Sequence, residues 1–171
     1  MHPAASVILF TVTSGMGYGL LILLALLGVT GALPLSAGFG VAGFGCALVL
    51  ITAGLLASTF HLGHPERAWR ALSQWRTSWL SREGVLAIAT YAPALVFAAG
   101  WILAGRRDGL FALAGWATAL LAVATVLCTA MIYASLKPIP QWRNRWVPAG
   151  YLAMALATAP RFLAPNDKGS L

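Results

Sequence analysis

Long uncharged stretches constrain this chain more than any other feature of its sequence. No Asp, Glu, Lys or Arg occurs before Glu66, and further uncharged runs cover residues 84–105, 109–136 and 146–160. An α-helix needs about 20 apolar residues to cross the hydrocarbon core of a bilayer. The first stretch is therefore long enough for two membrane-spanning helices, and each of the next two runs is long enough for one.

The composition places the chain in a membrane. Of its 171 residues 60% are hydrophobic and 9% are charged, whereas a soluble domain is about 25% charged. This excludes a soluble enzyme, a disordered tail and a disulfide scaffold, and it argues against a nucleic-acid binder despite the net charge of +7. The apolar runs are continuous, unlike the alternating strands of a membrane barrel. We predict a single all-α domain, a polytopic transmembrane helical bundle.

The positions of charged and turn-forming residues also give approximate helix boundaries. Gly, Pro and Ser between residues 31 and 36 predict a tight turn between the first two helices. A fifth apolar run, near 146–163, has only fifteen uncharged residues, about 22 Å of helix, and Pro160 and Arg161 interrupt it. Four to five spans are therefore expected, the first four near residues 6–30, 37–62, 84–104 and 110–136.

Small residues recur inside the expected spans. Gly15 with Gly19, and Gly43 with Ala47, form small-xxx-small pairs that allow close helix packing. We interpret them as packing contacts within the bundle rather than as a dimer interface. The pattern Gly-x-Gly-x-x-Gly at residues 38–43 lacks the strand and the later acidic residue of a dinucleotide site, so no nucleotide binding is expected.

The cysteines and histidines predict neither a metal site nor haem. Cys46 and Cys128 lie far apart in the sequence, and an iron–sulfur cluster needs about four cysteine thiolates as ligands. His61 and His64 are three residues apart at the end of the second span, on one turn of one helix. They cannot approach a haem iron from opposite sides.

The segment at residues 63–83 joins the second and third spans and is rich in Trp and Arg. Trp69, Leu72, Trp75 and Trp79 recur at spacings of 3, 3 and 4, which indicates one helical face. We predict an interfacial amphipathic helix that meets lipid headgroups or a partner protein, with Ser81 as the N-cap of the next helix and Glu83 in its first turn. The docking residues expected here and after the fourth span are Arg67, Arg70, Arg76, Trp69, Trp75, Trp79 and Trp142.

Three motifs together resemble a known family. His61 to Ala68 reads His-Leu-Gly-His-Pro-Glu-Arg-Ala, residues 81–83 read Ser-Arg-Glu, and residues 132–135 read Ile-Tyr-Ala-Ser before Pro140-Gln141-Trp142. The sequence resembles the membrane anchor subunit of the dimethyl sulfoxide reductase family, the DmsC type, over nearly its whole length. That family has about eight spans, so the chain is expected to be a copy shortened at its C-terminus, a gene fragment or a divergent half-length form.

The resemblance implies a role in anaerobic or respiratory electron transport. Such an anchor holds a molybdopterin catalytic subunit and an iron–sulfur subunit with [4Fe-4S] clusters at the bacterial inner membrane. It binds quinone or menaquinone transiently and no haem, and the other cofactors lie in the partner subunits. The chain would then be a part of an oxidoreductase complex without catalytic residues of its own, with quinol oxidation at its rim.

Four residues are candidates for quinone binding and proton transfer: His61, Glu83, Arg82 and Tyr133. Each quinone oxygen needs a hydrogen-bond partner, and the site needs a titratable group. Imidazole titrates near neutral pH, and a carboxylate at a membrane boundary is costly unless it has a task or a partner. The structural alternative for Glu83 is stabilisation of the helix N-terminus or an ion pair with Arg82.

Other functions and the orientation stay open at this point. The anchor of a related sulfite-oxidising complex would reduce quinone instead, and a small transporter or an assembly factor is a further alternative. Seven basic residues on the N-terminal side against four on the other favour the N-terminal side in the cytoplasm. The resemblance instead places the quinone motif, which lies on this same side, in the periplasm. Two explanations of the conflict stay open: the arginines are docking residues that override the charge rule, or the catalytic partner subunits are cytoplasmic.

Overall fold

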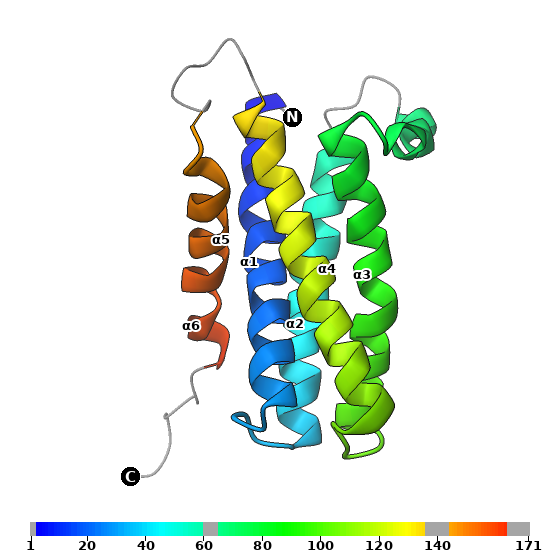
Figure 1. The fold of residues 1–171 in the computed structure, drawn as a ribbon, viewed down its shortest axis with the longest axis vertical. Coiled ribbons are helices and arrows are strands. Elements are labelled where there is room, and N and C mark those ends of the chain that lie inside the picture. The colour runs from blue at the N-terminus through cyan, green and yellow to red at the C-terminus, as the bar shows by residue number, and fades with distance from the viewer. Residues whose placement is uncertain (1–2, 60–64, 136–143, 164–171) are drawn as a thin grey trace.

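The computed structural model describes residues 3–59, 65–135 and 144–163, with side chains throughout except at 3–5, 65–68, 71 and 161–162. Every regular element in these ranges is a helix. The four long helices α1 (Pro3–Val29), α2 (Ala37–Thr59), α3 (Trp79–Ile102) and α4 (Gly109–Ala134) run antiparallel to their neighbours in one bundle (Figure 1). This confirms the predicted all-α bundle.

Three short helices complete the described part. The 3-10 helix η1 (Pro65–Gln74) lies at the end of the bundle where α3 begins, and α5 (Val147–Thr158) with α6 (Pro160–Leu163) lies beside α1 (Figure 1). Proline has no N–H to donate and clashes with the preceding turn, which explains why α5 ends before Pro160. Two of the predicted boundaries differ by about five residues: α3 begins at Trp79 rather than near residue 84, and α5 ends at Thr158 rather than near residue 163.

Length separates four of these helices from the rest. In the described ranges α1 to α4 are long and apolar enough to cross a membrane, whereas α5 is a shorter apolar helix of 12 residues. At 1.5 Å per residue α5 covers about 18 Å, well short of the bilayer core of about 30 Å. The described chain therefore has four candidate spans, with α5 as a shorter apolar helix packed against them.

The predicted turn between the first two spans is present. Gly31 has a φ of 81°, a left-handed conformation that glycine adopts without strain. The Ser36 hydroxyl accepts a hydrogen bond from the Phe39 N–H at 3.2 Å, which caps the start of α2. The chain reverses here because glycine allows the turn and serine satisfies the new helix end.

Buried aromatic rings hold the bundle together at the end that carries this turn. Phe44 of α2 and Phe97 and Trp101 of α3 pack edge to face, with ring centroids 5.7–5.8 Å apart. Gly28 of α1 faces Trp101 and Gly115 of α4 faces Phe97, and neither position has room for a side chain. All four long helices therefore meet at these rings, which we call the aromatic end.

Two polar contacts tie the loops together at the aromatic end. The Trp101 indole N–H donates to the Ser36 backbone oxygen at 3.2 Å. Arg107 donates to the Leu33 backbone oxygen at 2.8 Å, and its guanidinium lies 4.9 Å from the Trp101 ring centre. These contacts satisfy carbonyl groups of the α1–α2 turn from the α3–α4 side.

The small-residue pairs lie at helix contacts, with one exception. A Cβ at Gly43 would meet the Leu24 side chain of α1, and one at Gly17 would lie 2.8 Å from the Ala47 backbone oxygen of α2. Gly19 faces the backbone of Ala155 in α5 so closely that a Cβ would overlap it. These contacts confirm packing within the bundle, whereas a Cβ at Gly15 would have nothing within 4 Å.

Candidate functional site

Helix α3 begins earlier than the sequence analysis predicts, which places the candidate carboxyl group of Glu83 beyond the first turn of the helix. Ser78 rather than Ser81 is the N-cap, and its hydroxyl accepts a hydrogen bond from the Ser81 N–H at 3.4 Å. The Arg82 side chain donates to the backbone oxygens of Trp75 (2.9 Å) and Arg76 (2.7 Å), which holds the preceding turn in place. The prediction that Ser81 caps the helix with Glu83 in its first turn was wrong, because α3 begins one turn earlier.

Glu83 points into the bundle. Its side chain is only 4% exposed, and it accepts a hydrogen bond from the Thr129 hydroxyl of α4. Thr129 also contacts the Thr125 backbone oxygen at 3.1 Å. A hydroxyl has one proton to donate, so the Glu83 carboxyl and the Thr125 backbone oxygen compete for it. An ionisable group buried in a membrane helix is by default a functional candidate.

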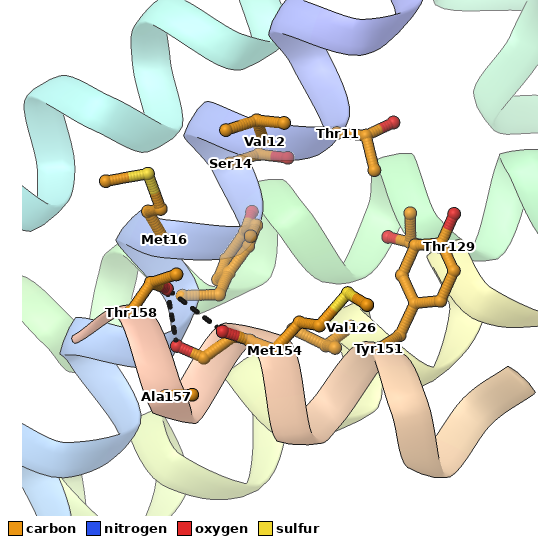
Figure 2. A pocket seen from close by; sticks show the side chains of 13 residues that line it. Thr11, Val12, Ser14, Met16, Val126, Thr129, Tyr151, Met154, Ala157 and Thr158 are labelled. Atoms are coloured by element: carbon orange, nitrogen blue, oxygen red, sulfur yellow. Dashed lines mark hydrogen bonds between the residues drawn. The ribbon is translucent and has the colours of Figure 1, made fainter.

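A cavity of about 870 Å³ opens between α1, α4 and α5, with Thr129 in its wall. Figure 2 shows side chains from these three helices around it. The volume is typical of a small-molecule site, and so is the mostly apolar lining with few polar groups. Its polar lining residues are Thr11, Ser14, Tyr18, Thr129, Tyr151 and Thr158.

Several of these hydroxyls are already used within their own helices. Ser14 donates to the Phe10 backbone oxygen at 2.6 Å. Thr158 lies 3.0 Å from the backbone oxygens of both Met154 and Ala155, as the dashed lines in Figure 2 mark. Such bonds satisfy the hydroxyl locally, whereas Thr129 also contacts a carboxyl on another helix.

Tyr133 lies beside this cavity, one turn beyond Thr129. Its hydroxyl is 3.0 Å from the Thr11 hydroxyl of α1. Its ring stacks on Tyr151 of α5, with centroids 5.5 Å apart, and both Thr11 and Tyr151 line the cavity. The structure therefore brings two of the four predicted quinone residues, Glu83 and Tyr133, to the same region of the bundle.

The other two candidates lie elsewhere. Arg82 contacts the backbone of the segment before α3 and lies 4.4 Å from the Trp79 ring centre. His61 lies outside the described residues, and so does Trp142. Among the residues that the structure does describe, no group of three His, Cys, Asp or Glu side chains is placed to hold a metal ion.

The Trp- and Arg-rich segment is divided differently from the prediction. Trp69 belongs to η1, whose three-residue turns align every third side chain, Trp75 follows it directly, and Trp79 begins α3. Trp69 is 66% and Trp75 54% exposed, and Arg70 and Arg76 lie 5.5 and 5.6 Å from the centres of these rings. These two tryptophans and two arginines therefore present aromatic rings and cations on one exposed segment. The side chain of Arg67 is not among those described.

Sequence reasoning missed three polar residues of the cavity wall. Thr129, Tyr18 and Tyr151 are single polar residues inside apolar runs, where such residues are common. The one available signal was the spacing of four between Thr129 and Tyr133, which places both on one face of a helix.

Comparisons with known proteins agree with the resemblance. The family described as "DMSO reductase anchor subunit (DmsC)" matches residues 1–164. A sulfite dehydrogenase subunit of Allochromatium vinosum is 40% identical over 92% of this chain and 53% of its own length. One of the chains of the anaerobic dimethyl sulfoxide reductase of Escherichia coli K12 is 32% identical over 66% of this chain and 39% of its own length. The protein thus spans about half the length, or less, of these relatives, and no solved structure matches it.

Proposed function

This chain belongs to the family of DMSO reductase anchor subunits, and we propose that it is the quinone-reactive membrane anchor of a molybdenum oxidoreductase complex. The observation that carries this proposal is the cavity between α1, α4 and α5, whose wall holds the Thr129–Glu83 hydrogen bond. It combines an apolar space inside a membrane bundle with a buried group that can exchange a proton.

The lining suits a quinone ring. A quinone is flat and apolar apart from two oxygens, so its site needs a large apolar surface and a few hydrogen-bond donors. The apolar lining comes from Val12, Met16, Val126 and Met154. Among these, Val12 and Met154 are more than half exposed on the outer surface of the bundle, which supports entry of the ligand from the bilayer.

The reaction sets what the residues must do. Oxidation of a quinol releases two electrons and two protons, and reduction of a quinone takes up the same. We assign proton exchange to Glu83 acting beside Thr129, and a hydrogen bond to the quinone to Tyr133. His61 remains a predicted proton carrier, and Arg82 a predicted member of the site that acts by holding the start of α3.

The electrons require partner subunits. We propose an iron–sulfur subunit that exchanges electrons with the quinone and a molybdopterin subunit that transforms the final substrate. The exposed Trp69, Arg70, Trp75 and Arg76 lie at the same end of the bundle as the start of α3, and they supply cations and rings for an acidic protein face or for lipid phosphate. Haem plays no part in this scheme, and the bacterial inner membrane is the proposed location.

The direction of electron flow separates two versions of this function. The greater identity with a sulfite dehydrogenase subunit favours the version in which electrons from sulfite oxidation reduce quinone. The dimethyl sulfoxide reductase relative supports the opposite direction, with quinol as the donor. A complex purified with its partner subunits distinguishes them, since only the first version reduces added quinone when sulfite is supplied.

Filling the cavity tests the proposed site. A Cβ at Gly15 meets open space, and Gly15 lines the cavity, so Gly15→Phe should occupy it without displacing a helix. Gly45→Phe is the matched control, because Gly45 also faces open space but lies on α2 away from the cavity. Quinone-dependent turnover should fall in the first variant and persist in the second, while activity with a redox dye that bypasses quinone persists in both. Equal quinone turnover in both variants would contradict the proposed site.

A further inference from the structure

The hydroxyl of Tyr18 on α1 stands out among the buried polar groups of the described residues. The side chain is 3% exposed, and its oxygen has no hydrogen-bond partner among the described residues. Nearly all buried polar atoms in native proteins are hydrogen-bonded, and an unpaired one costs stability. A phenylalanine would fill the same space without that cost, so the hydroxyl calls for a functional explanation.

The position of Tyr18 connects it to Glu83. Tyr18 and Thr129 both line the cavity, and Thr129 hydrogen-bonds Glu83. Side chains on an α-helix lean toward its N-terminus, so the Tyr18 ring extends from α1 toward the level of Ser14. The Glu83 carboxyl lies within electrostatic range of the Tyr18 hydroxyl.

The other groups around Glu83 leave room for a second donor. Cys128 of α4 and Tyr151 of α5 also lie within its electrostatic range, and α2 has no titratable residue between positions 47 and 59. On α3 itself, Arg82 donates to two backbone oxygens, and Tyr91 is 2.7 Å from the Thr52 hydroxyl. Thr129 has a single proton and two acceptors in reach.

We propose that Tyr18 is a positioning residue for Glu83: its hydroxyl donates, directly or through one water molecule, to the carboxylate that remains after Glu83 has given its proton to a quinone oxygen. This rests on the proposed quinone function. One proton leaves the carboxyl, one negative charge stays on it, and Tyr18 keeps its own proton throughout. A hydrogen bond to the charged form of a carboxyl favours that form, so Tyr18 lowers the cost of the transfer.

The test replaces Tyr18 by Phe in the complex purified with its partner subunits. Turnover with a short-chain naphthoquinone, and with a benzoquinone alongside, should fall about tenfold, the effect of one charge-stabilising contact. The limb of the pH profile that depends on ionisation of Glu83 should move to higher pH, because the carboxylate loses a donor. Thermal stability in detergent should stay unchanged or rise, because an unpaired buried hydroxyl is removed.

Tyr91→Phe is the matched control, since it removes a hydroxyl that does have a partner in the fold. It should lower thermal stability and leave the pH profile unchanged, the opposite pattern to Tyr18→Phe. A Tyr18→Phe complex with wild-type turnover and pH profile, or one with reduced stability, overturns the role of Tyr18. Absence of quinone binding in the wild-type complex overturns the proposed function itself, which is a different result.

Discussion

Gly19 of α1 lies against the backbone of Ala155 in α5 so closely that no side chain fits between them. This contact fixes the distance between the two helices that flank the cavity. Even Gly19→Ala should push α5 outward, at a cost of about 1–3 kcal/mol for overpacking. Thermal unfolding in detergent measures the loss, and faster proteolysis within residues 147–158 reports the displaced helix.

Gly15 provides the control for this prediction, because it lies one turn away on the same helix and faces open space. Gly15→Ala should be neutral or stabilise α1 by about 0.5–1 kcal/mol, since alanine is the better helix former. Similar losses in the two variants would show that helix propensity, and not the contact with α5, determines the effect.

Loss of the Thr129 hydroxyl should destabilise the bundle. Thr129→Val keeps the shape of the side chain but leaves the buried Glu83 carboxyl without the donor that the described residues provide. A buried polar group that loses its partner costs about 1–3 kcal/mol, and more when it is charged. Thr118→Val is the control, because Thr118 is also buried on α4 and bonds only the Ala114 backbone oxygen in the described part. Equal melting temperatures for the two variants would contradict the prediction.

Adjacent arginines at the aromatic end should differ in their importance. Arg107 binds the Leu33 backbone oxygen and stacks on Trp101, so Arg107→Gln should cost about 1.5–3 kcal/mol, as for other hydrogen bonds from charged groups. Arg106 pairs with Asp108 at 3.0 Å on the exposed surface, where ion pairs contribute little. Arg106→Gln should therefore leave the unfolding temperature nearly unchanged, and added salt should not alter this order.

The same exposed pair predicts a pH effect. The hydrogen bond from Arg106 holds the pKa of Asp108 below its usual value. A lowered pKa in the folded state stabilises the fold above the unfolded pKa, and this contribution disappears as the pH falls through the folded pKa. Arg106→Gln should raise the pKa of Asp108, which a carbon NMR titration of its carboxyl in detergent measures. Arg107→Gln should leave that titration curve in place.

The membrane helices were predictable because charge is costly in a bilayer. The uncharged runs before Glu66 and over residues 84–105 and 109–136 leave few ways to place four spans. The start of α3 was predicted too late, because Ser78 and Ser81 are both acceptable caps by sequence. Only the contacts of Arg82 with the backbone of Trp75 and Arg76, which depend on the folded turn, select the earlier one.

The cavity could not be predicted from the sequence. It exists because α5 packs on α1 at Gly19 while Gly15, one turn away, has no neighbour. Both are glycines in a uniformly apolar helix, and nothing in their spacing distinguishes the contact from the open space. Glu83 was a candidate from its residue type and its place in the Ser-Arg-Glu motif, but its link to the cavity through Thr129 requires the packing of α3 on α4.

The aromatic end has a consequence for how the bundle moves. Phe44, Phe97 and Trp101 bring all four long helices together there, with Gly28 and Gly115 against the rings. We expect this packing to resist separation of the helices, so helix motion should be larger at the end that holds Glu83. Local opening draws on the least stable regions of a fold. Exchange of a molecule between the cavity and the bilayer should therefore require local opening at the Glu83 end only, with the aromatic end still packed.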